Sequence, residues 1–214
     1  MEAQTFSDSG GASGLTQSER RRQSERALVD AAISVVAESG VAALTFEAIG
    51  EKSGYSRGLV TQRFGSKRGL IEAMIEQLHA EMQALIAERG IDELPGLEAV
   101  LTWADLYLRE VFQSERLQTY FKLLAAAVAD TTDLRSAFAA EHERVKTLLG
   151  NLIKKGQGEG NIRPELDSDA VATLIGSLQM GISTQLLVDP GTAFEPLLAM
   201  MVEALRRTLA PVAC

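Results

Sequence analysis

A short segment near residue 60 carries side chains that can recognise bases in DNA. Arginine can hold guanine through two parallel hydrogen bonds, glutamine can pair with adenine, and threonine can contact a thymine methyl group. Glycine lets a backbone come close to a ligand. A helix is predicted from about Arg57 to Phe64. If its residues Leu59, Val60 and Phe64 turn inward, the opposite face is free to contact DNA bases, and we call it the reading face. That face consists of Arg57, Gly58, Thr61, Gln62 and Arg63.

A tight corner precedes this helix, at Ser53-Gly54-Tyr55-Ser56. Gly54 can take the positive φ that ends a preceding helix, and Ser56 offers a hydroxyl to cap the following one. Thr45 is a suitable cap for the preceding helix, with Glu47 in its first turn, where negative charge meets the positive end of the helix dipole. Two short helices joined by such a corner predict a helix-turn-helix.

Two helix starts in this region are expected to hold phosphate groups. Backbone N–H groups and the positive end of the helix dipole lie at Ser56 and Arg57. Ser66 can cap the next helix, which places Lys67 and Arg68 in its first turn. Cations there oppose the helix dipole, so a phosphate backbone would explain their presence.

Four arginines, Arg20, Arg21, Arg22 and Arg26, lie near the start of the first predicted helix. Such a run is usually a solvated face. Next to a reading helix it also suits a phosphate contact or a minor-groove arm. The predicted DNA-binding residues are Arg20, Arg21, Arg22, Thr45, Ser56, Arg57, Gly58, Leu59, Thr61, Gln62, Arg63 and Lys67.

Residues 45–70 resemble the signature of the TetR family of bacterial transcriptional repressors. Thr61 stands where the family usually has Tyr, and Arg63 stands where it often has His. Both positions lie on the predicted reading face, so an operator preference cannot be copied from a relative. Other departures keep a small or apolar side chain: Gly50, Ser53 and Val60. The matching residues are Thr45, Ile49, Gly54, Ser56, Gly58, Phe64, Ser66, Lys67 and Leu70.

Length and composition fit one or two helical domains. The chain has 214 residues, 46% of them apolar, and 5 prolines, which is typical of a soluble, largely helical protein. Its single cysteine, at position 214, forbids an internal disulfide and suits a reducing cytoplasm. The N-terminus lacks the apolar stretch of a secretory signal, and we expect residues 1–16 to form a disordered arm.

The net charge of −8 is unevenly distributed along the chain. Residues 15–70 hold nine Lys or Arg against six Asp or Glu, whereas residues 71–214 hold 12 against 21. Net charges of opposite sign are expected for the two parts if the first faces DNA phosphates and the second does not.

The apolar spacing predicts an all-α protein, since no segment alternates as a strand would. Thr16 and Glu19 form a capping box for the first helix, and a long helix runs from Ser66 to Gly90. We predict a helix-turn-helix domain over 17–65 and a ligand-binding and dimerisation domain over 66–214. Further helices are expected at 97–112, 115–129, 133–155, 167–188 and 192–209, with breaks at 94–96, 156–164 and 189–191.

The segment 170–188 carries no charge over 19 residues. Its six Ser, Thr and Gln side chains argue against a membrane span and favour a buried interface helix. In the TetR family the last two helices pair with their copies in a second subunit, and Gly176 and Gly181 would permit close approach. The alternative is that this apolar surface fills the core of a monomer. The predicted homodimer residues are Leu174, Leu178, Ile182, Leu198, Met201 and Leu205.

Most aromatic residues lie between the long helix and the predicted dimer helices. They either pack as core or line a pocket. Because the second domain in the TetR family binds small inducers, the resemblance implies a cavity for a small, mostly apolar effector held by few hydrogen bonds. The predicted ligand-binding residues are Trp103, Tyr107, Tyr120, Phe121, Phe138, His142 and Gln179.

The sequence gives little indication of a catalytic site, and no cofactor or metal is expected. The two histidines, His79 and His142, lie 63 positions apart, and no thiol nucleophile is paired with a base. The stretch 156–160 is predicted to be a loop because it follows a helix rather than a strand. We therefore expect a homodimeric, ligand-responsive regulator that binds a double-stranded DNA operator. An architectural DNA-binding protein without a ligand is the alternative.

Overall fold

The computed structural model describes residues 16–129 and 134–211. Almost all of the predicted disordered arm, and Cys214, lie outside the described residues. The expected all-α fold is confirmed, because the described residues form helices and no strand. The α-helices are α1 (Gln17–Ser39), α2 (Phe46–Ser53), α3 (Arg57–Phe64), α4 (Lys67–Glu88), α5 (Gly96–Gln113), α6 (Glu115–Ala129), α7 (Arg135–Glu159), α8 (Ser168–Val188) and α9 (Phe194–Leu209).

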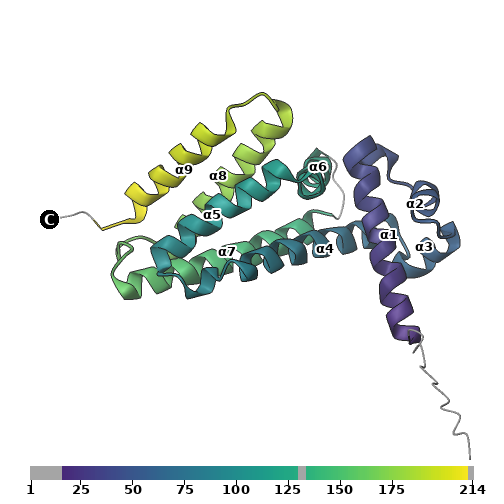
Figure 1. The fold of residues 1–214 in the computed structure, drawn as a ribbon, viewed down its shortest axis with the longest axis horizontal. Coiled ribbons are helices and arrows are strands. Elements are labelled where there is room, and N and C mark those ends of the chain that lie inside the picture. The colour runs from purple at the N-terminus through teal and green to yellow at the C-terminus, as the bar shows by residue number, and fades with distance from the viewer. Residues whose placement is uncertain (1–15, 130–133, 212–214) are drawn as a thin grey trace, which may run out of the picture.

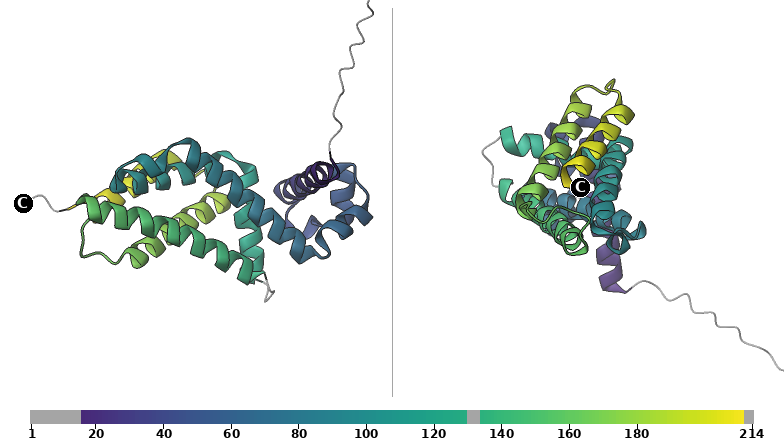
Figure 2. Two further views of the ribbon diagram at one scale, coloured as in Figure 1. Left: turned by 90° about the horizontal axis from the view of Figure 1, so that it is seen from below. Right: turned by 90° about the vertical axis from the view of Figure 1, so that its left-hand side faces the viewer.

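The first three helices gather at one end of the molecule, and we call them the head (Figure 1). Helix α4 runs from the head into the larger part, where it contacts α7. Helix α6, seen nearly end-on in Figure 1, lies between α1 of the head and the helices of the larger part. The left view of Figure 2 shows the same division from below. Two helices, α4 and α6, therefore connect the two parts.

Capping side chains start the first four helices at the predicted positions. Thr16 Oγ1 accepts a hydrogen bond from Glu19 N at 3.3 Å, and Glu19 Oε2 accepts one from Thr16 N at 2.7 Å. Thr45, Ser56 and Ser66 each accept a hydrogen bond from the backbone N–H three residues later. These bonds satisfy donors that a helix start leaves without a partner, so they fix where the helices begin.

The corner between α2 and α3 is tight. Gly54 ends α2 with a φ of +75°, as predicted. A Cβ at Gly50 would lie 2.8 Å from Tyr55 O and 3.3 Å from Arg57 N. The glycine at position 50, where the TetR family usually has alanine, therefore lets the turn fold closely onto α2.

Helix α7 is longer than the sequence indicated. The prediction of a loop at 156–160 is wrong, because α7 continues through Glu159 and ends at Gly160 with a φ of +75°. A Cβ on Gly96, at the start of α5, would lie 2.2 Å from Gly156 N. These two glycines let α5 begin directly against α7. Close packing therefore outweighs the low helix propensity of glycine.

The end of α7 also caps the start of α5. Gly96 N donates to Glu159 Oε2 at 2.7 Å, and Leu97 N donates to Asn161 Oδ1 at 3.0 Å. The hydrogen bond from Gly96 N lowers the pKa of Glu159 below its ordinary value. Lys155 Nζ donates to two backbone carbonyl oxygens just before α5, those of Asp92 and Leu94, each at 2.7 Å. The segment after α4 is thus tied to α7 by side chains.

Helix α8 is the one described helix that is long and apolar enough, by length and composition alone, to cross a membrane. Core helices of soluble proteins pass the same test. Two of its polar side chains, Gln179 and Ser183, are buried within the protein, and Gln179 Nε2 donates to Ala104 O of α5. The helix therefore packs as part of the helical bundle.

The α5–α7 contact can be tested with two glycine substitutions. Gly96→Ala should destabilise the protein by about 1–3 kcal/mol, because its Cβ would meet backbone atoms of Gly156. Gly158→Ala is the matched control, since nothing lies within 4 Å of an added Cβ there. In a helix the control should raise stability by up to about 1 kcal/mol. Thermal melting of both variants measures the difference, and equal melting temperatures would contradict the close contact.

Candidate DNA-binding surface, ligand cavity and interdomain joint

The predicted reading helix is α3, and its outer face is exposed. Arg57, Gly58, Thr61 and Gln62 are all exposed, whereas Val60 is fully buried against the head core. Arg57 Nη1 lies 2.9 Å from a carboxylate oxygen of Glu47, in an exposed pair. Such a surface pair contributes little stability, so it leaves Arg57 able to contact another anion.

The structure corrects the placement of Arg63. This residue is half-buried, and its Nη2 donates to Ser24 Oγ of α1 at 3.4 Å. Its Nε is buried without a hydrogen-bond partner among the described residues. The reason is helical periodicity: Arg63 lies three residues after the buried Val60 and shares its side of α3. Arg63 therefore packs α3 against α1 and is not free to face outward.

Leu59 is likewise half-buried against the core, with less side chain available to DNA than the sequence suggested. The other predicted DNA contacts are exposed around α3. Ser56 and Lys67 lie at the starts of α3 and α4, and Thr45 caps α2. Arg20, Arg21 and Arg22 are exposed on the first turns of α1, which project beyond α3 (Figure 1).

A cavity of about 380 Å³ lies among α4, α5, α6, α7 and α8. The predicted residues lining it are Trp103, Tyr107, Tyr120, Phe121, His142 and Gln179. Phe138 does not line it, which corrects that prediction. Phe138 is 2% exposed and packs edge-on against the ring of Tyr120, with ring centroids 5.2 Å apart. It supports the wall from behind because α7 turns this position toward the core.

The cavity wall contains polar as well as apolar side chains, and some of the polar atoms are buried. Trp103 Nε1 and His142 Nε2 are buried and have no hydrogen-bond partner among the described residues. Burial lowers the pKa of His142, which favours its neutral form, and the charge of Glu141 opposes this only in part. Burial also raises the pKa of Tyr107 and of Tyr120, with a smaller effect from Glu141. The wall thus combines apolar and aromatic side chains with several polar and charged ones.

Glu141, which no sequence pattern singled out, is 4% exposed and lines the cavity. Its carboxylate lies against His79 Nδ1 of α4 and forms an ion pair with Arg144 Nη1 at 2.9 Å. The spacing of Glu141 and Arg144 at i and i+3 was the available sequence signal. It could not distinguish this buried carboxylate from the other acids of the chain. Helix α4 also supplies apolar lining residues: Leu78, Met82 and Ile86.

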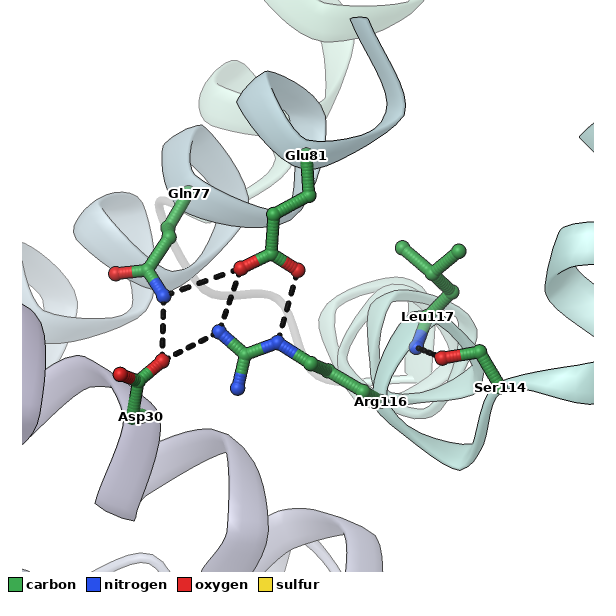
Figure 3. Close-up of polar contacts among 6 residues, drawn as sticks. All are labelled: Asp30, Gln77, Glu81, Ser114, Arg116 and Leu117. Carbon is green, nitrogen blue, oxygen red and sulfur yellow. Dashed lines mark hydrogen bonds and ion pairs between the residues drawn. The ribbon is translucent and has the colours of Figure 1, made fainter. Parts of the chain in front are cut away.

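One arginine of α6 bonds both α1 of the head and α4. Figure 3 shows Arg116 of α6 between Glu81 of α4 and Asp30 of α1. Its Nε and Nη2 donate to the two oxygens of Glu81 at 2.8 and 2.7 Å, and Nη2 also donates to Asp30 Oδ1 at 2.5 Å. Gln77 Nε2 donates to Asp30 at 2.7 Å and to Glu81 at 3.3 Å. Hydrogen bonds to Glu81 raise the pKa of Arg116.

Helix α6 makes a second contact with the head. Lys122 Nζ donates to Ala37 O, near the end of α1, at 2.7 Å. A cation at a helix C-terminus is favoured by the helix dipole. Leu117, Tyr120 and Phe121 of the same helix line the cavity. One helix therefore contacts both the cavity and the head.

Two family models match this chain. The model of bacterial regulatory proteins of the tetR family matches residues 28–74. The model of the BetI-type transcriptional repressor C-terminal region matches residues 97–210, which is more than half of the chain. The chain belongs to the TetR family of transcriptional regulators. The resemblance noted over residues 45–70 is thereby confirmed, and the matching families are regulatory proteins, not enzymes.

Individual TetR-family proteins are similar at low identity. The HTH-type transcriptional regulator TtgR of Pseudomonas putida is 24% identical over 180 residues, covering 80% of this chain and 84% of that protein. A putative TetR-family regulator from Rhodococcus sp. has a TM-score of 0.78 at 19% identity, covering 88% of this chain and 100% of the other. SmeT, the repressor of the Stenotrophomonas maltophilia multidrug efflux pump SmeDEF, has a TM-score of 0.71 at 18% identity, covering 87% and 90%. These structures share the fold.

The predicted dimer residues of this TetR-family chain fall into two groups. On α8, Leu174 and Leu178 are 49% and 39% exposed, and Ile182 is half-buried. The three residues predicted on α9 are instead buried within the protomer, which corrects their assignment. Helix α9 has one apolar face, and that face packs against α5. Those buried residues are Leu198, Met201 and Leu205.

An apolar surface remains open on α8 and α9. Val188 is 76% exposed at the end of α8, and Met200 is 71% exposed on α9. A Cβ added at Gly176 or Gly181 of α8 would meet nothing within 4 Å. Gly181 is exposed, so the backbone there leaves room for another helix to approach closely, whereas Gly176 also lines the cavity.

Base and phosphate contacts at the α3 surface can be separated by substitution. Gln62→Ala should reduce operator affinity by about 1–3 kcal/mol and relax the preference at one base position. Lys67→Ala should weaken operator and random DNA alike and reduce the salt dependence of binding. Fluorescence anisotropy on both kinds of DNA at several salt concentrations measures these effects. Equal losses on both kinds of DNA for Gln62→Ala would contradict its place on the reading face.

Arg63→Ala provides a second test of the corrected placement. Because Arg63 contacts Ser24 of α1, its loss should lower the melting temperature of the protein as well as operator affinity. Gln62→Ala is the matched control, since Gln62 is exposed and should leave the melting temperature unchanged. An unaltered melting temperature for Arg63→Ala would return this residue to the reading face.

Proposed function

We propose that this protein is a homodimeric transcriptional repressor that leaves an inverted-repeat operator when a small, mostly apolar molecule enters the cavity. The observation that carries the proposal is the double role of α6. Leu117, Tyr120 and Phe121 face the cavity, while Arg116 and Lys122 bond the head. A molecule that moves the cavity wall therefore also moves the bonds that orient the DNA-binding helices.

The regulation follows from thermodynamic coupling between two sites. If the ligand favours a dimer whose heads are wrongly spaced for the operator, it weakens DNA binding by some factor. DNA must then weaken ligand binding by the same factor. Helix α4, which leaves the head at Lys67 and lines the cavity with Leu78 and Met82, is one proposed transmitting helix. Arg116 adds α6 to this route, because its guanidinium bonds Glu81 of α4 and Asp30 of α1 together.

The proposed division of the chain places DNA binding in residues 17–65 and ligand binding and dimerisation in 66–214. We propose that two copies pair through the open faces of α8 and α9, where Leu174, Leu178 and Met200 are exposed. A dimer would present two heads to two half-sites about one helical turn of DNA, ~34 Å, or more apart. The proposed location is the cytoplasm, where the DNA is.

An architectural DNA-binding protein without a ligand is the alternative. It would bind many sequences with steep salt dependence and would not respond to small molecules. The cavity of about 380 Å³, with its aromatic wall and unpartnered Trp103 Nε1, supports the ligand-responsive proposal.

Selection of bound sites from random DNA tests the proposed function directly. The expected result is an inverted repeat bound by two protomers, as measured by the mass of the complex in solution. Recovery of unrelated sequences that bind equally well would favour the architectural alternative. Neighbouring genes would then be found from the selected repeat.

The joint at Arg116 gives a specific prediction. Arg116→Ala should lower operator affinity severalfold, about 1 kcal/mol, because the head loses its fixed orientation and Asp30 faces Glu81 without a cation. Arg109→Ala is the matched control, since Arg109 also bonds two carboxylates, Asp105 of α5 and Glu195 of α9, neither of which belongs to the head. Operator titration by fluorescence anisotropy measures both, and equal affinities for the two variants would refute the joint.

A further inference from the structure

The cavity wall contains a buried negative charge. Glu141 is 4% exposed, and an ionised carboxylate in such a place is costly unless it is paired. Its Oε2 pairs with Arg144 at 2.9 Å, but the side chain of Arg144 is 60% exposed, so water and salt screen its charge. Its Oε1 lies against His79 Nδ1, which compensates the charge only when that ring is protonated. No cation as deeply buried as Glu141 therefore offsets it among the described residues.

The remaining charged groups of the wall cancel one another. Glu143 and Lys146 both line the cavity and form an ion pair at 2.7 Å. His142 faces the cavity with a pKa lowered by burial, which favours the neutral ring. The negative charge of Glu141 reaches the phenols, since it adds to the burial that raises the pKa of Tyr107. The wall as a whole is electronegative.

Aromatic rings also form part of the wall. Trp103 and Tyr107 stack with ring centroids 5.2 Å apart, and Tyr120 and Phe121 meet edge to face at 5.4 Å. All four rings line the cavity. The faces of aromatic rings carry negative potential and attract cations, most strongly where water is excluded.

We propose that the cavity binds an organic cation, that is, an apolar framework carrying one ammonium or similar positive group, with Glu141 as its counter-charge. This inference rests on the proposed function for the use of the cavity as the effector site, and it adds the sign of the effector's charge. A carboxylate-bearing ligand would meet the charge of Glu141 and is disfavoured. A neutral ligand would gain the apolar contacts but leave Glu141 with its present partners.

Two isosteric probes separate charge from shape. Benzyltrimethylammonium and neopentylbenzene differ by a quaternary nitrogen in place of a quaternary carbon. The expected result is that the cation binds the full-length protein about tenfold or more tightly, which corresponds to about 1.4 kcal/mol. Titration calorimetry measures both affinities, and the fluorescence of Trp103, the single tryptophan, should change on binding. Equal affinities, or no binding of the cation, would overturn the proposal.

Variants locate the charge that is responsible. Glu141→Gln should lower the affinity for benzyltrimethylammonium about tenfold and leave that for neopentylbenzene unchanged. The double variant Glu143→Gln with Lys146→Gln is the matched control, because it removes both members of a paired, cavity-lining couple and leaves the net charge of the wall unchanged. Thermal melting of Glu141→Gln shows whether this variant is folded. If it is not folded, the affinities of the two probes for the unaltered protein still test the proposal. An equal loss with both variants would contradict the role of Glu141.

The outcomes also distinguish this inference from the proposed function. Benzyltrimethylammonium that binds through Glu141 without releasing the operator would support the cation site and contradict its use as an effector site. Release of the operator by neopentylbenzene, with no preference for the cation, would support ligand response and overturn the cation site.

Discussion

The guanidinium group of Arg116 bonds Asp30 of α1 and Glu81 of α4 at the same time, from a third helix. Two carboxylates converge on one cation, so each of them needs Arg116 to offset its repulsion from the other. Gln77 adds hydrogen bonds to both acids but no charge. The orientation of the DNA-binding helices relative to the cavity thus depends on where α6 holds this group (Figure 3).

The position of α6 makes that dependence relevant to regulation. Leu117 follows Arg116 directly and lines the cavity, and Tyr120 lies one turn further along the same wall. A helix moves as a rigid element, so a displacement at Tyr120 is felt at Arg116 and at Lys122, which bonds the end of α1. The packed Phe138 behind Tyr120 limits how the wall can yield. The cavity and the head are therefore linked through short, contiguous contacts.

The proposed DNA-binding surface and the proposed dimer surface lie on different parts of the chain. Gln62 and Lys67 are exposed on the head, and Leu178 and Met200 are exposed on α8 and α9. The basic excess of residues 15–70 and the acidic excess of the remainder match this separation. Repulsion between the acidic part and phosphate favours approach through the head alone.

The sequence by itself determined the features that depend on neighbours in the chain. The caps at Thr16, Thr45, Ser56 and Ser66 start helices where predicted, because a cap bonds a backbone group only three residues away. Apolar periodicity likewise indicated the helix order, and α6 has the predicted bounds. Helix α3 also has the predicted bounds, Arg57–Phe64.

Only the tertiary structure decided which of several similar faces a residue occupies. Arg63 is drawn to Ser24 on another helix, and the α9 leucines, such as Leu198, pack against α5 instead of a second copy. Gly156 lies within a helix because α5 begins against it, and Glu141 is buried because α4 and α7 close over it. Apolar periodicity shows that a helix has an apolar face or a face of small residues, but it does not show which other helix packs against that face. That choice depends on contacts between distant parts of the chain.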